Sequence, residues 1–399
     1  MKRSLIALAC SATIASAYAD VDVSGGIKMY GVLDQSITSQ KLVRPDTGAA
    51  QEYIGMFAAN ATSRIGFKGS RDLSEGFKGI FQAEIQLDPD TSTLLPSKNR
   101  TAFVGLQSAD AGTLMMGTME TAAYEVFGMD VNGRVEYKPQ VWRTTTSLDL
   151  QDRANNSIKY ISPEFGGLAF HYQQSFSEYS DTSSPVGSTD NKYAEIISVA
   201  LKYHKENMKA AYVHDETKNA LMGFKFAGLS NAGPTTTGTS DGLYYYGGFK
   251  DTTTSSQANT TAAITNATIQ RDIASIGYDF GSFYLNYLYA KSALTGTYAG
   301  SNTTQTIGVR VPYEKFTFAL SYGTGSVNSY YSSSVDPGTT TTAPAGRAKD
   351  GSLSDTTVGV YYNFDKSTSV YFLGSSSKSS VGDYDGSNTT VAIGARYNF

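Results

Sequence analysis

The sequence is short of cysteine, tryptophan and long apolar runs. One cysteine, Cys10, and one tryptophan occur in 399 residues. Because Cys10 lies in an N-terminal segment that we expect to be cleaved, the mature chain has neither a disulfide framework nor a thiolate metal site. Beyond that segment, no stretch reaches the roughly 18 apolar residues of a membrane-spanning helix. Membrane strands are not excluded, since they need only about 9–11 residues of alternating polarity.

Excess positive charge and clustered metal ligands are also absent. The formal net charge is −4, and loss of Lys2 and Arg3 with the N-terminal segment takes it to −6. Nucleic-acid-binding domains favour basic patches, so we expect no nucleic-acid partner. The three histidines, His171, His204 and His214, are widely spaced and form no His-Glu-x-x-His motif. We therefore expect no metal and no cofactor.

The N-terminus has the pattern of a cleaved secretory signal peptide. A short basic region at Lys2 is followed by mostly apolar residues and then by Ala17-Tyr18-Ala19 before Asp20. We predict cleavage after Ala19, which divides the chain into a signal peptide (1–19) and one domain (20–399). The alternative is a lipoprotein signal at Cys10, but it has Ala7 where leucine is usual and too short an apolar stretch.

Apolar and polar residues alternate along many segments. At the C-terminus, Val391, Ile393, Ala395, Tyr397 and Phe399 alternate with small or polar residues. A period of two indicates a strand with two unlike faces. The same pattern recurs at 64–68, 81–87, 168–173 and 316–322.

The predicted strands come in pairs joined by short turns, and long Ser/Thr/Gly/Asn-rich stretches separate the pairs. The turns are expected near 72–76, 108–112, 162–166, 204–207, 279–281, 312–315 and 365–368. The long stretches are 39–60, 89–99, 119–152, 177–191, 217–269, 293–303, 325–354 and 377–389. Seven turns and eight loops join sixteen strands, and an even number with short turns on one side is the arrangement of outer-membrane barrels.

A soluble β-sandwich or β-helix would also alternate, and alternation alone does not say which face points inward. The face opposite the apolar one carries Arg, Lys, Gln and Asn on strand after strand, and the chain has a signal peptide. We therefore predict an all-β fold, a 16-stranded antiparallel transmembrane β-barrel, whose closure leaves no exposed edge.

Several segments resemble the general porins of Gram-negative bacteria, in particular the Neisseria- and Burkholderia-like group. They are Ser63-Arg64-Ile65-Gly66-Phe67-Lys68-Gly69 before Asp72-Leu73, Arg100-Thr101-Ala102-Phe103-Val104-Gly105-Leu106, Asn156-Ser157-Ile158-Lys159-Tyr160 with Ser162-Pro163-Glu164-Phe165-Gly166-Gly167, and the terminal Arg396-Tyr397-Asn398-Phe399. The resemblance implies short periplasmic turns, long extracellular loops, a third loop folded into the barrel and location in the outer membrane.

The resemblance also implies partners. These are further copies of the chain in a homotrimer, outer-membrane lipid and lipopolysaccharide, and the small hydrophilic solutes and ions that pass the channel. A final aromatic residue after an alternating strand is similar to the signal read by the outer-membrane assembly machinery, which gives Phe399 a role in assembly.

Charged residues on the face opposite the apolar one are expected to line the pore. A lipid-facing Lys or Arg costs about 2–4 kcal/mol near the midplane. Arg100 does not fit clearly on either face of its alternating segment, and on this argument it is also assigned to the lumen. The predicted lining residues are Arg64, Lys68, Lys78, Arg100, Arg153, Lys159, Asp34 and Glu84.

In the porins that the chain resembles, a basic cluster on the wall faces an acidic third loop. By motif alignment Arg64, Arg100 and Arg153 occupy the positions of that cluster. The third loop would span 119–152, with Glu125 and Asp130 as the acidic wall. The chain departs from the family pattern at Gly117-Thr118, where Gly-Arg is common. Asp149 and Asp152 could contribute to a calcium site, but two acids are far fewer than the 6–8 oxygen ligands that calcium takes.

One catalytic pattern occurs, in surroundings that argue against it. Gly238-Thr239-Ser240-Asp241-Gly242 fits the nucleophile-elbow consensus but lies in a Thr- and Gly-rich tract without a strand-turn-helix context. A hydrolytic barrel would need a Ser or Asp paired with a histidine on its wall, and His171 alone is placed in mid-strand facing the lumen. We predict no enzyme.

The function that these features predict is passive diffusion of small hydrophilic solutes and ions, with a weak preference for anions. Two alternatives stay open. One is a substrate-specific channel, which would need a ladder of aromatic residues or a dedicated binding site. The other is a barrel acting mainly in surface adhesion or recognition through its long loops, especially 217–269 and 325–354.

Overall fold

The computed structural model describes most of the predicted strands and the first part of the third loop. The described residues are 21–24, 26–43, 50–57, 59–90, 93–95, 100–132, 153–176, 195–218, 268–295, 299–331, 351–380 and 386–399. The predicted signal peptide lies outside the described residues, as do Asp149, Asp152 and most of 217–269 and 325–354.

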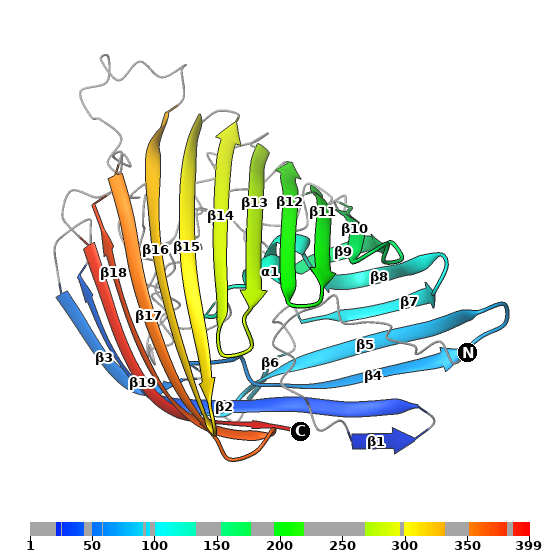
Figure 1. The fold of residues 1–399 in the computed structure, drawn as a ribbon, viewed down its shortest axis with the longest axis horizontal. Coiled ribbons are helices and arrows are strands. Elements are labelled where there is room, and N and C mark those ends of the chain that lie inside the picture. Colours follow the sequence, from blue (N-terminus) through cyan, green and yellow to red (C-terminus); the bar gives the residue numbers. More distant parts are fainter. Residues whose placement is uncertain are drawn as a thin grey trace, which may run out of the picture.

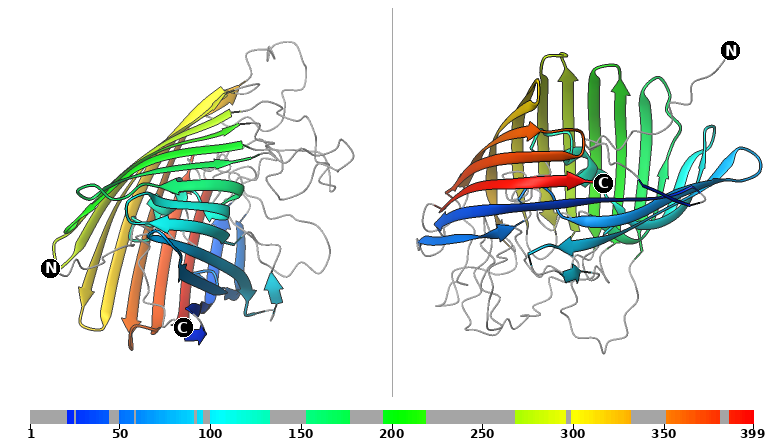
Figure 2. Two further views of the ribbon diagram at one scale, coloured as in Figure 1. Left: turned by 90° about the vertical axis from the view of Figure 1, so that its right-hand side faces the viewer. Right: turned by 90° about the horizontal axis from the view of Figure 1, so that it is seen from below.

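The strands form one antiparallel sheet that closes on itself, with a short helix on its inner side (Figures 1 and 2). Closure occurs where β19 pairs with β2 along Ser387–Asn398. The elements are β1 (Val21–Ser24), β2 (Ile27–Val43), β3 (Ala50–Phe57), β4 (Arg64–Asp72), β5 (Phe77–Asp88), β6 (Thr93–Leu95), β7 (Ala102–Ser108), β8 (Gly112–Glu120), α1 (Ala122–Phe127), β9 (Arg153–Ile161), β10 (Leu168–Ser175), β11 (Glu195–Lys205), β12 (Met208–Lys218), β13 (Thr268–Asp279), β14 (Tyr284–Thr295), β15 (Ala299–Tyr313), β16 (Phe316–Tyr331), β17 (Gly351–Asn363), β18 (Thr368–Ser379) and β19 (Gly386–Asn398).

The 19 strand segments occupy sixteen positions around the barrel. β3 and β4 both pair with β2, one after the other, and so share one position. β6 and β7 likewise both pair with β5, at different parts of that strand, and so share one position. β1 and β19 both pair with β2 and share one position. β1 pairs with the start of β2, beyond Gly31, which exchanges two backbone hydrogen bonds of 2.6 and 3.1 Å with Phe399 at the end of the chain. The predicted 16-stranded antiparallel barrel is confirmed.

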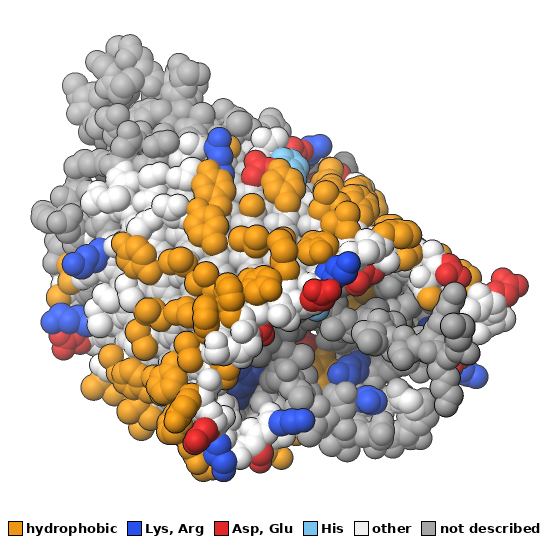
Figure 3. Space-filling view, in the orientation of Figure 1, with side chains coloured by type: hydrophobic (Ala, Val, Ile, Leu, Met, Phe, Trp, Pro, Cys, Tyr) orange, Lys and Arg blue, Asp and Glu red, His pale blue; other side chains and the backbone are white. Residues whose placement is uncertain are grey.

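The two faces of the barrel have opposite polarity, with the apolar side chains outside. Val104 and Ile393 are each 65% exposed although they lie in the middle of strands, whereas Ser321 and Thr357 are fully buried. Figure 3 shows the hydrophobic side chains spread over the outer surface above β12 to β17, with charged side chains mainly at the margins. A soluble barrel would have the reverse pattern, so the outer face is suited to lipid and the inner face to water.

Each predicted turn joins two strands of the barrel. Six of these seven turns contain a residue with positive φ, among them Gly281 (φ 84°) and Glu206 (φ 54°). Glycine adopts this conformation without strain, which explains why short turns of the sequence are rich in it. In the described part of the chain no helix has the length and hydropathy needed to cross a membrane.

Candidate functional site: the lumen and its third loop

The third loop turns into the barrel directly after β8. The Thr121 hydroxyl accepts a hydrogen bond from the Tyr124 backbone N–H (3.2 Å) and so caps the N-terminus of α1. The apolar face of α1 packs against small and branched residues on the inner face of β11–β14. The buried set is Ala122, Ala123, Val126 and Phe127 of the helix with Ala200, Ala211, Val213, Ile273, Leu288 and Ala290 of the wall. These apolar wall positions, unusual for a lumen, provide the docking site of the loop.

Beyond α1 the loop continues along the inner wall across β14 to β17. The Val131 backbone N–H donates to Asn286 Oδ1 (3.2 Å), and Asn132 Nδ2 donates to Ser321 Oγ (3.0 Å) and to the Thr357 carbonyl (3.2 Å). Gly308 permits this approach, because a Cβ there would lie 2.8 Å from Val131 Cγ2. Residues 121–132 therefore lie flat on one side of the lumen.

Glu125 on α1 is directed at the barrel wall. Its two carboxylate oxygens are bound by Lys159 of β9 and Lys202 of β11, and His171 Nδ1 lies 3.8 Å away. Glu125 is 13% exposed and Lys159 is 3% exposed. Burial alone would raise the pKa of Glu125, but the positive charges of Lys159 and Lys202 outweigh burial and hold the pKa well below its usual value. Glu125 thus anchors the loop to two strands.

Asp130, the other predicted loop acid, is also buried, at 2% exposure. One of its oxygens accepts the Asn132 backbone N–H at 3.3 Å, and a Cβ on Gly308 would lie 3.1 Å from that oxygen. The structure therefore places Glu125 and Asp130 against β9–β15, with their charges directed toward the wall.

Arg64 and Arg100 share the carboxylate of Glu84 on the part of the wall formed by β4 and β5. Arg100 Nη2 lies 3.0 Å from Glu84 Oε2, and Arg64 Nε lies 3.5 Å from Glu84 Oε1. Tyr30 donates its hydroxyl to Glu84 Oε1 (2.8 Å) and accepts a hydrogen bond from Gln82 Nε2 (2.6 Å). Because two guanidinium groups share one carboxylate, Arg64, Arg100 and Glu84 together carry excess positive charge.

Arg153, the third predicted member, lies near Arg100 and is held by its own partners. Its Nη2 is 3.0 Å from Glu120 Oε1, its Nε donates to Thr101 Oγ1 (3.4 Å), and its guanidinium lies 5.6 Å from the ring of Tyr124 on the third loop. Thr101, which Arg153 contacts, follows Arg100 in the chain, and Arg100 shares Glu84 with Arg64. The three arginines thus face one region of the lumen.

A β-bulge positions Arg153 at the base of the loop. Between β8 and β9, Gly117 pairs with Ser157 but Met119 pairs with Ala154, so β9 contains one extra residue. Gly117 has φ 138°, and a Cβ there would collide with the backbone of β7. Bulges commonly re-aim a side chain, and this one brings Arg153 opposite Glu120.

The other predicted lining residues occupy different levels of the barrel. Lys68 Nζ lies 4.9 Å from the Tyr30 ring centroid, beside the arginines. Lys78 pairs with Asp72 (3.3 Å) at the turn end of β5, where its side chain is 46% exposed. Asp34 is buried in the wall, where Oδ1 accepts the Tyr371 hydroxyl (2.7 Å). Lys78 is therefore at the rim, whereas Asp34 is a structural carboxylate between strands.

Three lumen residues that these contacts depend on were not assigned to the pore lining from the sequence: Glu120, which was placed only within the third loop, Lys202 and Tyr284. Lys202 shares its inward parity with Ser198 and Ala200 of β11, so the alternation could have identified it. Glu120 follows the bulge at Gly117 and Met119, which interrupts the alternation of inward and outward side chains, so the alternation does not show where Glu120 points. The Tyr284 hydroxyl donates to the Met129 carbonyl (3.2 Å), a contact that only the docked loop creates.

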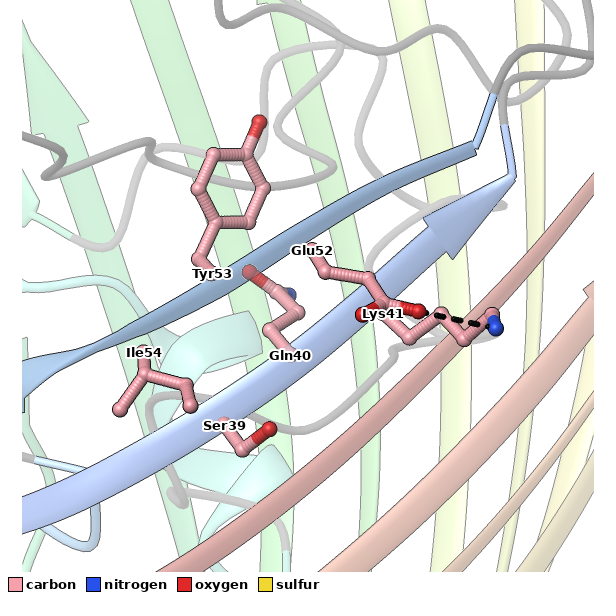
Figure 4. Close-up of a pocket in the computed structure, with 6 residues that line it drawn as sticks. All are labelled: Ser39, Gln40, Lys41, Glu52, Tyr53 and Ile54. Atoms are coloured by element: carbon pink, nitrogen blue, oxygen red, sulfur yellow. Dashed lines mark ion pairs between the residues drawn. The ribbon is translucent and has the colours of Figure 1, made fainter.

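Two further features add little to the site. In the described part of the chain, no group of three or more His, Cys, Asp or Glu side chains could hold a metal ion. A shallow pocket between β2 and β3 is lined by residues such as Gln40 and Tyr53 and is crossed by an ion pair between Lys41 and Glu52 at 2.9 Å (Figure 4). Because Lys41 and Glu52 are mostly exposed, the pair contributes little binding energy.

Comparison with known proteins agrees with this architecture. A family model described as Gram-negative porin matches residues 4–380. The chain is 31% identical over 219 residues to the major outer membrane protein P.IB of Neisseria gonorrhoeae, covering 53% of this chain and 56% of that protein. It is 33% identical over 178 residues to the P.IB protein of Neisseria meningitidis serogroup B, covering 45% and 50%. The chain thus spans about half the length of the curated relatives it matches.

Solved structures show the same fold at low sequence identity. The anion-selective porin from Comamonas acidovorans superposes with a TM-score of 0.63 at 16% identity, covering 94% of this chain and 99% of that chain. OmpT of Vibrio cholerae superposes with a TM-score of 0.62 at 14% identity, covering 96% and 100%. From the family match over most of its length, together with the closed barrel, its apolar exterior and its polar lumen, the chain belongs to the Gram-negative porin family, and its barrel is located in the outer membrane.

Proposed function

We propose that the protein is a general diffusion porin, through which small hydrophilic solutes and ions cross the outer membrane passively. The observation that carries this proposal is the polar inner face of a closed barrel, with the third loop docked against one side. The described part of the loop, 121–132, lies against the wall and so narrows the lumen from that side. The lumen groups act through their charge and shape alone, which is what selection by diffusion requires.

The test is conductance together with solute uptake. Purified protein in planar bilayers is expected to give stable, stepwise conductance, and proteoliposomes are expected to swell in small neutral sugars and not in large ones. Heat-unfolded protein is the control. No conductance steps, or swelling with a single sugar and none of similar size, would contradict a general diffusion porin.

A weak preference for anions is part of the proposal. Around the docked loop the ion pairs join Arg64, Arg100, Arg153, Lys159 and Lys202 to Glu84, Glu120 and Glu125, an excess of two positive charges. The loop acid that could have cancelled the arginines is instead neutralised by Lys159 and Lys202. Permeant ions pass close to these groups, whereas charges at the mouth are screened over about 8–10 Å.

We also propose a homotrimer in contact with outer-membrane lipid and lipopolysaccharide. The apolar outer face supports burial in lipid or against another copy. One solved structure of similar fold, OmpT of Vibrio cholerae, is described in a trimer form. Analytical ultracentrifugation in mild detergent is expected to give three copies per particle, and a monomer at all detergent concentrations would contradict the trimer.

Phe399 is proposed as part of the signal that the assembly machinery reads. In the folded barrel it closes the ring through its two backbone hydrogen bonds with Gly31, and its ring stacks on Tyr397 at 6.2 Å between centroids. Deletion of Phe399 is expected to reduce the amount of barrel in the outer membrane while secretion to the periplasm continues. Because Phe399→Tyr keeps both the aromatic ring and the backbone bonds, it is the matched control. Unchanged assembly after the deletion would remove this role.

A further inference from the structure

A second set of cations lies on the inner wall, on the far side of the ring from β7. Arg310 of β15 and Lys209 of β12 both point into the barrel and are partly exposed. Within the described part of the chain, neither has a carboxylate at salt-bridge distance. They therefore differ from the arginines of the basic cluster, each of which is paired with Glu84 or Glu120.

The strand register places these cations at the edge of the docked loop. Lys209, Gly277, Asn286, Gly308 and Ser321 are successive cross-strand partners in one row. In the loop, Val131 bonds to Asn286 of that row and Asn132 to Ser321. Arg310 lies two residues farther along β15 toward the short turn, which is about 7 Å at 3.3–3.4 Å per residue. An ion that has passed the third loop therefore meets Arg310 next.

Tyr284 holds the guanidinium of Arg310 in place. The two residues are cross-strand partners, and the guanidinium lies 5.1 Å from the ring centroid. Tyr284 is itself fixed by its hydrogen bond to Met129 and by its position over Gly277, where a Cβ would come within 2.6 Å of the ring. A cation over an aromatic face is stabilised without giving up its N–H groups, which stay available to a ligand.

The charges around Arg310 favour an anion with more than one oxygen. Gly277, which lies under the Tyr284 ring, is the cross-strand partner of Lys209, so the ring that holds the Arg310 guanidinium reaches the position beside Lys209. Two acids of the described residues lie nearby: Asp279 is the cross-strand partner of Tyr284, and Asp130 lies against Gly308, where its Oδ1 accepts the Asn132 backbone N–H. A planar guanidinium binds two oxygens at once and an ammonium adds a point charge, which together suit a divalent oxyanion better than chloride.

We propose that Arg310 and Lys209 form an oxyanion-binding site beside the docked third loop, on its turn side. This inference rests on the proposed channel function and gives the channel a second position for anions after the basic cluster. Sulfate, phosphate and small carboxylates share the chemistry that the site recognises. The site would slow the passage of divalent oxyanions and so compete with chloride for the lumen.

The experiment is a titration of the chloride current in planar bilayers with sulfate and, separately, with acetate. Sulfate is expected to reduce the current of the wild-type channel at lower concentration than acetate does. Arg310→Ser is expected to raise the half-blocking sulfate concentration about tenfold, as one charge-assisted bidentate partner is lost, and Lys209→Ser to raise it less. Arg310→Lys, which keeps the charge but not the fork, is expected to fall between wild type and Arg310→Ser.

Lys315→Ser is the matched control, since Lys315 belongs to the same wall but lies in the exposed turn after β15. It removes one positive charge and is expected to leave the sulfate block within about twofold, because exposed charges at the mouth are screened. All variants are first checked for the faster gel mobility of a folded barrel. Equal sulfate block in wild type and Arg310→Ser, or no block of the wild type, would overturn the site. Failure of the wild type to conduct in KCl would instead overturn the channel function.

Discussion

The two sides of the lumen hold their charges differently. On the side of β4, β7 and β9, arginines outnumber the carboxylates that they bind, with Arg64 and Arg100 sharing Glu84. Where α1 docks on the wall, one loop carboxylate, Glu125, is shared by Lys159 of β9 and Lys202 of β11. Both sides therefore retain excess positive charge, although the chain as a whole is acidic. The comparison shows that the field in the lumen follows from local pairing more than from net charge.

The largest expected effect comes from removing the arginines on the first side. Arg64→Ser combined with Arg100→Ser leaves Glu84 without either arginine and removes the excess of two positive charges among the ion pairs around the loop. We expect the anion-to-cation permeability ratio to fall about fivefold in a narrow, low-dielectric cleft. The measurement is the reversal potential in a KCl gradient at low salt. Lys78→Ser, at the exposed rim, is the control, and a double variant with the wild-type potential would show that the pair does not line the constriction.

Breaking the second side is expected to loosen the third loop. Glu125→Gln leaves Lys159 and Lys202 close together with no carboxylate between them, and such a loss at a buried pair costs about 3–5 kcal/mol. We expect higher and noisier single-channel conductance as α1 leaves the wall. Glu195→Gln, an outward-facing change, should leave the conductance as it is. Quiet, unchanged conductance in Glu125→Gln would mean that the lysines do not hold the loop.

A smaller effect is expected from crowding the loop without changing charge. Gly308→Val places atoms where Val131 and Asp130 lie, so residues 130–132 must move. The expected result is a modest rise in conductance with an unchanged reversal potential. Gly374→Val is the matched control, because a Cβ there meets no atom closer than 3.5 Å. An equal effect of both substitutions would assign the change to the strands instead of the loop.

Acid is expected to have the smallest effect. The pKa of Glu125 in the folded barrel is depressed below its ordinary value of 4.5, so its stabilising charge persists at that pH and is lost only as pH falls through the depressed value. Current noise should therefore stay constant from neutral pH down to 4.5. A rise in noise centred near 4.5 would show that the two lysines do not protect the carboxylate.

The fold followed from the sequence because strand parity and turn chemistry are local properties. The C-terminal alternation ending at Phe399 and the short turns were enough to predict the barrel. The direction of Glu125 was not predictable, because its lysines lie 34 and 77 residues away and the loop's position depends on apolar wall residues such as Ala211. The role of Arg310 was not predictable for a similar reason: its contact with Tyr284 depends on the cross-strand register of β14 and β15, and not on the spacing of the two residues in the sequence.

The most direct test of this account is the reversal potential of the wild-type channel in a KCl gradient at low salt, where screening is weakest. The excess positive charge on both sides of the lumen predicts a potential on the anion-selective side of zero, moving toward zero as salt is raised. A cation-selective potential that persists at low salt would contradict the claim that wall lysines neutralise the third-loop acid.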